Sequence, residues 1–156
     1  SGNTWSLPQQ LDWIDKQLNM LPSEQPVFCF LNVGETHVPY WHQGAKWERW
    51  PSPCIPFGGP SCSYTESSLR QRACLDWSDQ QLAPLLKRFE CCTVLVCADH
   101  GDCWGEDGLW EHGISHPSTL NVPLLMRVRG KPVDQIKTNS FLNFKSILKV
   151  LSSLRR

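Results

Sequence analysis

The sequence predicts an α/β fold with a mainly parallel sheet of a few strands and helices on both faces. Apolar segments of strand length alternate along the chain with segments of helical periodicity, which is typical of this class. Residues 27–33 and 93–98 are continuously apolar. Strands of this kind are expected where both faces of a parallel sheet are covered. We therefore expect a buried sheet between two helical layers.

The first half of the chain is predicted to hold one helix, one strand and one long loop. A helix over residues 7–21 follows from the spacing of Leu11, Ile14 and Leu18, and Pro22 closes it. The strand over residues 27–33 comes next. Prolines, glycines and serines then interrupt every period over residues 42–67, so we expect a long loop. Such loops in compact domains are commonly functional.

The second half is predicted to alternate helices and strands. A helix is expected over residues 68–89, in which Pro84 causes a kink or begins a new turn. Strands are expected over residues 93–98 and 122–128, and a final amphipathic helix over residues 141–154. A chain of 156 residues is normally one domain. We therefore treat residues 1–156 as a single domain.

The charge balance argues against polyanionic partners. Fifteen basic and fifteen acidic side chains cancel, and no long run of one sign creates a field that attracts nucleic acid or an anionic membrane. The longest apolar stretches are far shorter than the roughly 20 residues that a membrane helix needs. We expect no nucleic-acid partner and no membrane segment, although a local site for one small anion remains compatible with this composition.

Eight cysteines are many for this length, but they do not form the paired motifs of a structural zinc ribbon. Cys29, Cys74 and Cys97 lie in apolar patterns, where a free cysteine behaves as a small hydrophobic residue. Cys54 and Cys62 flank a loop rich in proline and glycine, and a disulfide between them is an open alternative in an oxidising compartment. The cysteines within strands favour the cytoplasm over an extracytoplasmic location.

Several tryptophans cluster around the loops. We expect them to serve packing rather than ligand binding. They are Trp41, Trp47, Trp50, Trp104 and Trp110.

Histidines and carboxylates follow the predicted strands at their carboxyl ends. His37 follows the first strand, and Asp99 and His100 follow the second. His112 and His116 come shortly afterwards and can fold back over the same edge. Because ligands gather beyond the carboxyl ends of parallel strands, we expect these side chains to converge. Oxygen and imidazole ligands of this kind are suited to one or two divalent metals.

These motifs resemble those of a known family. The segments are Asp99-His100-Gly101-Asp102, residues 105–113, residues 121–125 and Glu35-Thr36-His37-Val38-Pro39-Tyr40. In this order they resemble the carboxyl-terminal half of the alkaline phosphatase superfamily. The sequence is most similar to sulfatases, lipoteichoic acid synthases and lipid A phosphoethanolamine transferases. The resemblance implies an alkaline-phosphatase-like core that lacks its amino-terminal half.

The resemblance also implies roles for individual residues. It makes Asp99 and His100 metal ligands, His112 a ligand or phosphoryl contact, and His37 a catalytic contact on the substrate side. His116 has no firm counterpart. It is either a supporting residue or a solvent-exposed histidine, and we favour solvent exposure. Asp102 is expected to support the site rather than bind metal. Histidine-rich ligation favours zinc or manganese, while magnesium and calcium remain alternatives.

Two functions follow as alternatives. The first is the divalent-metal-binding portion of a phosphoester or sulfoester hydrolase or transferase that acts on a small ester substrate. Its nucleophile is expected on a missing segment or another chain, which makes a homodimer or an amino-terminal partner segment an expected arrangement. The second is a non-catalytic module that binds metal or a phosphorylated ligand. A domain that uses its histidines only structurally is the remaining alternative.

Overall fold

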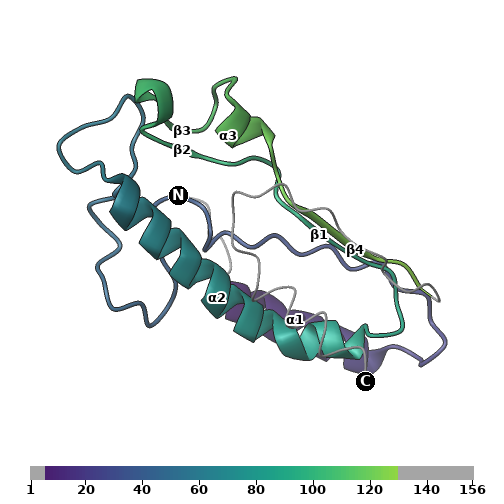
Figure 1. Cartoon of the computed structure of the whole chain (residues 1–156). Coiled ribbons are helices and arrows are strands. Elements are labelled where there is room, and N and C mark those ends of the chain that lie inside the picture. Colours follow the sequence, from purple (N-terminus) through teal and green to yellow (C-terminus); the bar gives the residue numbers. More distant parts are fainter. Residues whose placement is uncertain (1–5, 130–156) are drawn as a thin grey trace.

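The computed structural model of this protein describes residues 6–129. Two long helices, α1 (Leu7–Met20) and α2 (Tyr64–Arg88), come first. The remaining elements are short (Figure 1): β1 (Val94–Cys97), β2 (Cys103–Trp104), the 3₁₀ turn η1 (Glu106–Gly108), β3 (Trp110–Glu111), α3 (Pro117–Leu120) and β4 (Leu124–Arg127). The predicted helix over residues 141–154 lies outside the described residues.

Local signals determine where both long helices begin. The Gln9 side chain accepts a 2.9 Å hydrogen bond from the Ser6 backbone N–H at the start of α1. The Ser63 hydroxyl accepts from the Glu66 backbone N–H at 3.2 Å and caps α2. The predicted first helix is thus confirmed, whereas α2 begins before residue 68 because its cap is Ser63. Pro84 lies within α2.

The two helices contact each other near the end of α2. Arg88 places Nη1 at 2.7 Å from Asp15 Oδ1 and from Asn19 Oδ1, both on α1. Figure 1 shows the two helices on the opposite side of the molecule from the strands. Residues 21–63 connect α1 to α2 and contain neither helix nor strand.

The expected parallel sheet is wrong, and so is the alkaline-phosphatase-like core that the motif resemblance implied, because both sheets within residues 6–129 are antiparallel pairs. β1 pairs with β4 in antiparallel register, with Leu95 opposite Met126 and Cys97 opposite Leu124. β2 and β3 form a second antiparallel pair. A parallel pair needs a crossover of a dozen or more residues, usually a helix. Residues 98–123 are long enough for such a crossover, but they form a small hairpin and the four-residue α3 beyond the carboxyl end of β1, so the chain re-enters the sheet in the reverse direction.

The predicted strand over residues 27–33 is also wrong, because this segment belongs to no strand. Its side chains nevertheless alternate in exposure, and Phe28 is 91% exposed. Leu95, Leu124 and Met126, on one face of the β1–β4 pair, are exposed as well, whereas Leu125 on the other face is 2% exposed. Within residues 6–129, the apolar runs are therefore covered on one face rather than on the two that we expected.

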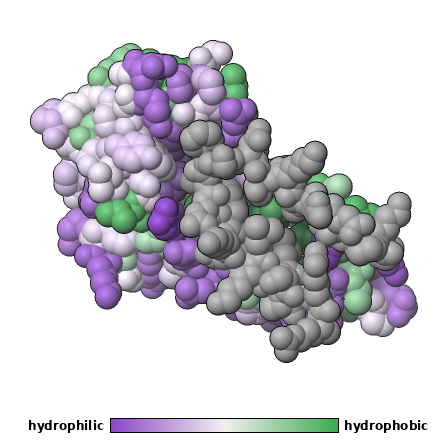
Figure 2. Space-filling model, viewed as in Figure 1, coloured by the Kyte–Doolittle hydropathy of each residue, from purple (hydrophilic) through white to green (hydrophobic). Residues whose placement is uncertain are grey.

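The best-packed region lies beside the hairpin rather than in the sheet. Tyr40, Cys54 and Cys74 are fully buried, and Trp47, Trp104 and Trp110 are among the residues that pack against them. The packing function expected for these three tryptophans is thus confirmed. Trp50 instead remains 64% exposed. Figure 2 shows that apolar patches interrupt a largely polar surface on the face in view.

The long loop is confirmed over most of its length, because residues 42–63 contain neither helix nor strand. The expected absence of a membrane segment agrees with the helices in the described part of the chain. Each of these helices is too short or too polar to cross a bilayer.

Candidate metal centre

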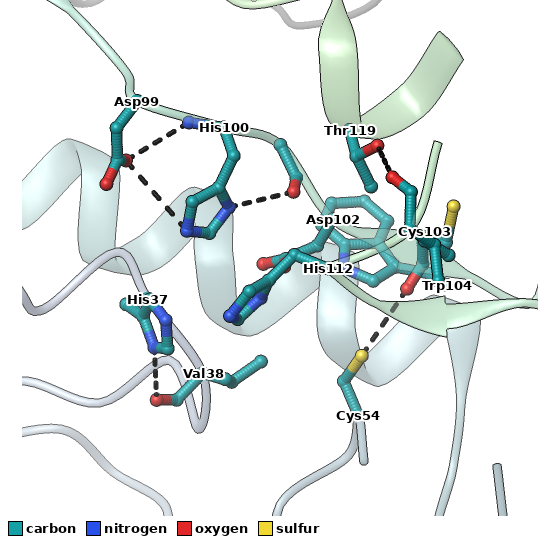
Figure 3. Close-up of polar contacts among 12 residues, drawn as sticks. His37, Val38, Cys54, Asp99, His100, Asp102, Cys103, Trp104, His112 and Thr119 are labelled. Carbon is teal, nitrogen blue, oxygen red and sulfur yellow. Dashed lines mark hydrogen bonds and ion pairs between the residues drawn. The ribbon is translucent and has the colours of Figure 1, made fainter. Parts of the chain in front are cut away.

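Three histidines from separate segments face one another. His37 lies in the turn that follows residues 27–33, His100 follows β1, and His112 follows β3. Figure 3 shows the three rings around a common space. One ligand nitrogen from each ring lies within 4.8 Å of the other two. The expected convergence therefore holds for these three residues, while their function as ligands or substrate contacts remains a prediction.

Each ring of this group forms a hydrogen bond through Nδ1. The partners are the Val38 carbonyl for His37 at 2.9 Å and the Gly101 carbonyl for His100 at 3.0 Å. His112 pairs with Asp102 Oδ1 at 2.7 Å. A carbonyl or carboxylate oxygen can only accept, so Nδ1 is the protonated nitrogen in all three neutral rings. Each ring is thereby left with its Nε2 lone pair for a metal.

The spacing of the rings is wider than that of a bound metal site. Zinc–nitrogen bonds of about 2.05 Å in tetrahedral geometry place two ligand nitrogens about 3.3 Å apart. Because all pairs of nitrogens lie within 4.8 Å, each pair needs to approach by at most roughly 1.5 Å. His37 is exposed, and the His100 and His112 side chains are 30% and 26% exposed. Small side-chain rotations can supply this movement.

A buried carboxylate supports the group from behind. The Asp102 side chain is 4% exposed and pairs with His112. Its second oxygen accepts a 2.7 Å hydrogen bond from the Tyr40 hydroxyl, which in turn accepts from Trp104 Nε1 at 2.9 Å. Carboxylates placed in this way fix the tautomer and orientation of ligand histidines. The arrangement agrees with the supporting function expected for Asp102.

Asp99 lies at the edge of the group. Its side chain is 90% exposed, and Oδ1 is 4.0 Å from His100 Nε2. Oδ1 also accepts a 3.1 Å hydrogen bond from the His100 backbone N–H. Asp99 therefore adjoins the nitrogen expected to bind metal, and its function as an oxygen ligand remains a prediction.

His116 lies outside the three-histidine group. Its Nδ1 is 3.2 Å from Cys103 Sγ and also accepts from the Ser118 backbone N–H, which caps α3. Its Nε2 is 3.3 Å from Asp107 Oδ2, and only 14% of its side chain is exposed. Of the two functions considered for His116, solvent exposure is thus wrong, and support of the local structure agrees with these contacts.

The remaining histidine belongs to the aromatic packing. His42 stacks on Trp77 with ring centroids 4.8 Å apart, and its Nδ1 pairs with the Gln43 carbonyl at 3.0 Å. The local Nδ1 bond therefore also occurs away from the three-histidine group. Convergence of the rings, and not this bond alone, distinguishes the candidate site.

Burial affects two ionisable groups beside the histidines. Burial, and then the negative charge of Asp102, raise the pKa of Glu111, while His112 and His37 oppose this effect. Burial, and then the negative charge of Glu106, raise the pKa of the Cys103 thiol. A buried thiol held in its neutral form is a poor nucleophile. The environment of Cys103 therefore does not favour it as the nucleophile that the motif resemblance implies.

The backbone at Glu111 and Gly113 turns sharply to present His112. Their φ angles are 61° and 82°, both in the left-handed region. Glycine adopts this conformation freely, whereas glutamate does so at an energetic cost.

The cysteines that flank the loop are not joined by a disulfide. Cys54 and Cys62 are both free in this structure, and Cys54 is buried. The Cys54 thiol points to the Cys103 carbonyl, with Sγ and the oxygen 3.4 Å apart. Cys54 thus contacts the site hairpin rather than the other end of its own loop.

Sequence reasoning missed Tyr40 and Trp104 as parts of the site. Tyr40 follows His37 by three residues, but no spacing rule connects its hydroxyl with Asp102, which is far along the chain.

Comparisons with protein-family models, curated proteins and solved structures found no match. The interpretation of the centre therefore depends on its own geometry and on the motif resemblance.

Proposed function

We propose that His37, His100 and His112 bind a divalent metal as part of a centre that acts on phosphoesters or sulfoesters. The observation that carries this proposal is that the three rings form the same kind of hydrogen bond and face one another. Each Nδ1 has an oxygen acceptor, and one ring nitrogen from each residue lies within 4.8 Å of the other two, close enough to reach one ion after modest rotation. Three histidines with an open fourth position are typical of catalytic zinc sites.

The donor set favours zinc or manganese. Neutral imidazoles suit these metals, whereas magnesium and calcium prefer oxygen ligands. Asp99 is the carboxylate placed to add an oxygen ligand, because its Oδ1 is already 4.0 Å from His100 Nε2. Rotation of this exposed side chain would bring it toward the same ion.

A metal held here would polarise the phosphoryl or sulfuryl oxygens and neutralise charge that develops during transfer. The chain's own residues would position the group. Asp102 holds His112 from behind, and the exposed ring of His37 is accessible to a substrate. The ester class comes from the motif resemblance. The nucleophile would come from a segment outside residues 6–129 or from a second chain.

Equilibrium dialysis with zinc and with manganese tests the metal site. We expect the parent chain to retain about one equivalent, His112→Ala to lose it, and Asp99→Ala to bind more weakly. His116→Asn is the matched control, because it removes an imidazole while asparagine keeps the cap of α3. Equal retention by the parent and His112→Ala would refute the proposed centre.

A second measurement tests the substrate class. Inorganic phosphate or sulfate should raise the melting temperature of the metal-loaded chain but not that of His112→Ala, because anion binding then depends on the metal. No shift with either anion would refute the ester assignment.

A non-catalytic binding module is the second candidate function. Cys103 lies beside His116 but is buried, and a buried thiol is a poor nucleophile. Metal-dependent hydrolysis of p-nitrophenyl phosphate or sulfate by the isolated chain would exclude the non-catalytic alternative. Anion binding without turnover would agree with either a binding module or a centre that needs a partner nucleophile.

A further inference from the structure

A line of partly buried hydrogen bonds leads away from the candidate metal centre. It passes from His112 to Asp102, from Asp102 to the Tyr40 hydroxyl, and from there to Trp104 Nε1, with distances of 2.7, 2.7 and 2.9 Å. Tyr40 is fully buried and the Asp102 side chain is 4% exposed. Water therefore has little access to Tyr40 and to the Asp102 carboxylate, and these two groups depend on their protein partners for orientation.

Tyr40 also belongs to the turn that carries another histidine of the group. Its backbone N–H donates to the His37 carbonyl at 2.8 Å, and its carbonyl accepts from Trp47 Nε1 at 3.0 Å. The φ angle of Tyr40 is 56°, in the left-handed region that a bulky side chain rarely adopts. The surrounding contacts hold the residue in this conformation. One residue thus joins the His37 turn to the carboxylate behind His112.

The charges around the Tyr40 hydroxyl agree with its role as a hydrogen-bond donor. Burial, followed by the negative charge of Asp102 and the hydrogen bond to it, raises the pKa of Tyr40. The hydroxyl therefore keeps its proton and donates a hydrogen bond to the carboxylate. Asp102 is left with its other oxygen for the Nδ1–H of His112.

We propose that Tyr40 is a positioning residue of the metal centre, acting through Asp102 on His112 and through its backbone on His37. This inference rests on the proposed metal-binding function. Its consequence is that the hydroxyl of a residue that touches no metal helps to set the metal affinity. Changes of the residues that hold metal-ligating histidines by hydrogen bonds typically reduce metal affinity by about 10- to 100-fold.

The test compares zinc affinity in Tyr40→Phe and Tyr64→Phe by competition with a chromophoric chelator. The chain contains two tyrosines, and both rings contact Trp104, with centroid distances of 6.2 and 5.7 Å. Tyr64 is 58% exposed and is therefore a matched control. We expect binding at least about tenfold weaker in Tyr40→Phe and an unchanged affinity in Tyr64→Phe.

A second variant and a second readout separate positioning from loss of folding. Asp102→Asn removes the carboxylate that fixes the His112 tautomer while it preserves the side-chain shape. Nitrogen-15 NMR of the metal-free chain should show a single Nδ1–H tautomer at His112 in the parent and a mixture in Asp102→Asn. Thermal unfolding shows whether each variant is folded. If Tyr40→Phe does not fold, the Asp102→Asn comparison decides the matter.

The outcomes distinguish the two proposals. Zinc binding by the parent with equal affinity in Tyr40→Phe overturns the positioning function of Tyr40 and leaves the metal site in place. An unchanged His112 tautomer in folded Asp102→Asn likewise overturns it. Failure of the parent to bind zinc overturns the metal site and, with it, the inference that depends on it.

Discussion

Gly101 offers a direct test of how the centre is built. It lies between His100 and Asp102, and its backbone N–H donates to the Thr119 carbonyl at 2.9 Å. A Cβ atom added at Gly101 would lie 2.1 Å from the Ser118 carbonyl oxygen, which is a backbone atom. A methyl group at this position therefore forces α3 away from the strand end that carries His100.

The size of the effect follows from this contact. Overpacking of a well-packed site typically costs about 1–3 kcal/mol, and loss of the hydrogen bond to Thr119 adds about 1 kcal/mol. We expect Gly101→Ala to lower the free energy of unfolding by roughly 2–4 kcal/mol. Zinc affinity should fall as well, because the Gly101 carbonyl accepts from His100 Nδ1.

Urea unfolding of the metal-free chain measures the stability effect. Gly34→Ala is the matched control, because an added Cβ there meets no atom within 4 Å. Alanine at such a site is expected to be neutral or to stabilise by about 0.4–1 kcal/mol through the unfolded state. Equal unfolding free energies for Gly101→Ala and Gly34→Ala would refute the close contact between α3 and the strand end.

Three further predictions concern the rest of the fold. Burial raises the pKa of Cys54 and Cys74 to about 12 from an ordinary value of 9.0. The folded state therefore favours the neutral thiols, and the associated stability is complete below pH 9.0 and is lost as the pH rises toward 12. When the free energy of unfolding is measured at several pH values, Cys74→Ala should lose less stability than the parent as the pH rises. An equal dependence of the unfolding free energy on pH in the two chains would contradict this reasoning. Ser63→Ala should destabilise the chain by about 1 kcal/mol in urea unfolding through loss of the α2 cap, and no change would show that the cap contributes nothing. Leu125→Ala should cost about 2–4 kcal/mol and Leu124→Ala less than about 1 kcal/mol, since only Leu125 is buried; equal losses would contradict the one-sided sheet.

The helices were predictable because their signals are local. The apolar spacing and the proline after α1 lie within a few residues of the element that they define, and the Ser63 cap similarly explains the start of α2. Strand direction has no such local signal. Residues 93–98 and 122–128 were identified correctly as containing strands, but their relative direction depends on the route of the chain between them. The short α3 and the hairpin decide that route, and neither carries a long periodic pattern.

The site was predicted from a premise that the structure does not support. Parallel strands were expected to bring their carboxyl ends together, yet β1 pairs antiparallel with β4, and the segment before His37 is not a strand. His100 does follow the carboxyl end of β1, whereas His112 follows the short strand of a hairpin. The three histidines therefore meet through turns rather than along one sheet edge.

Because the histidines lie in turns, side-chain contacts rather than the sheet place their segments relative to one another. A ladder of backbone hydrogen bonds fixes the position of a strand end, but the segments of His37 and His112 lie outside the β1–β4 pair. Their relative position depends on side chains that join them, and Tyr40 with Asp102 is the buried link between the two segments. Such a link has no periodic signature, because it joins residues far apart in sequence through one hydroxyl. The candidate ligands could thus be inferred from the sequence, whereas their hydrogen-bond partners required the structure.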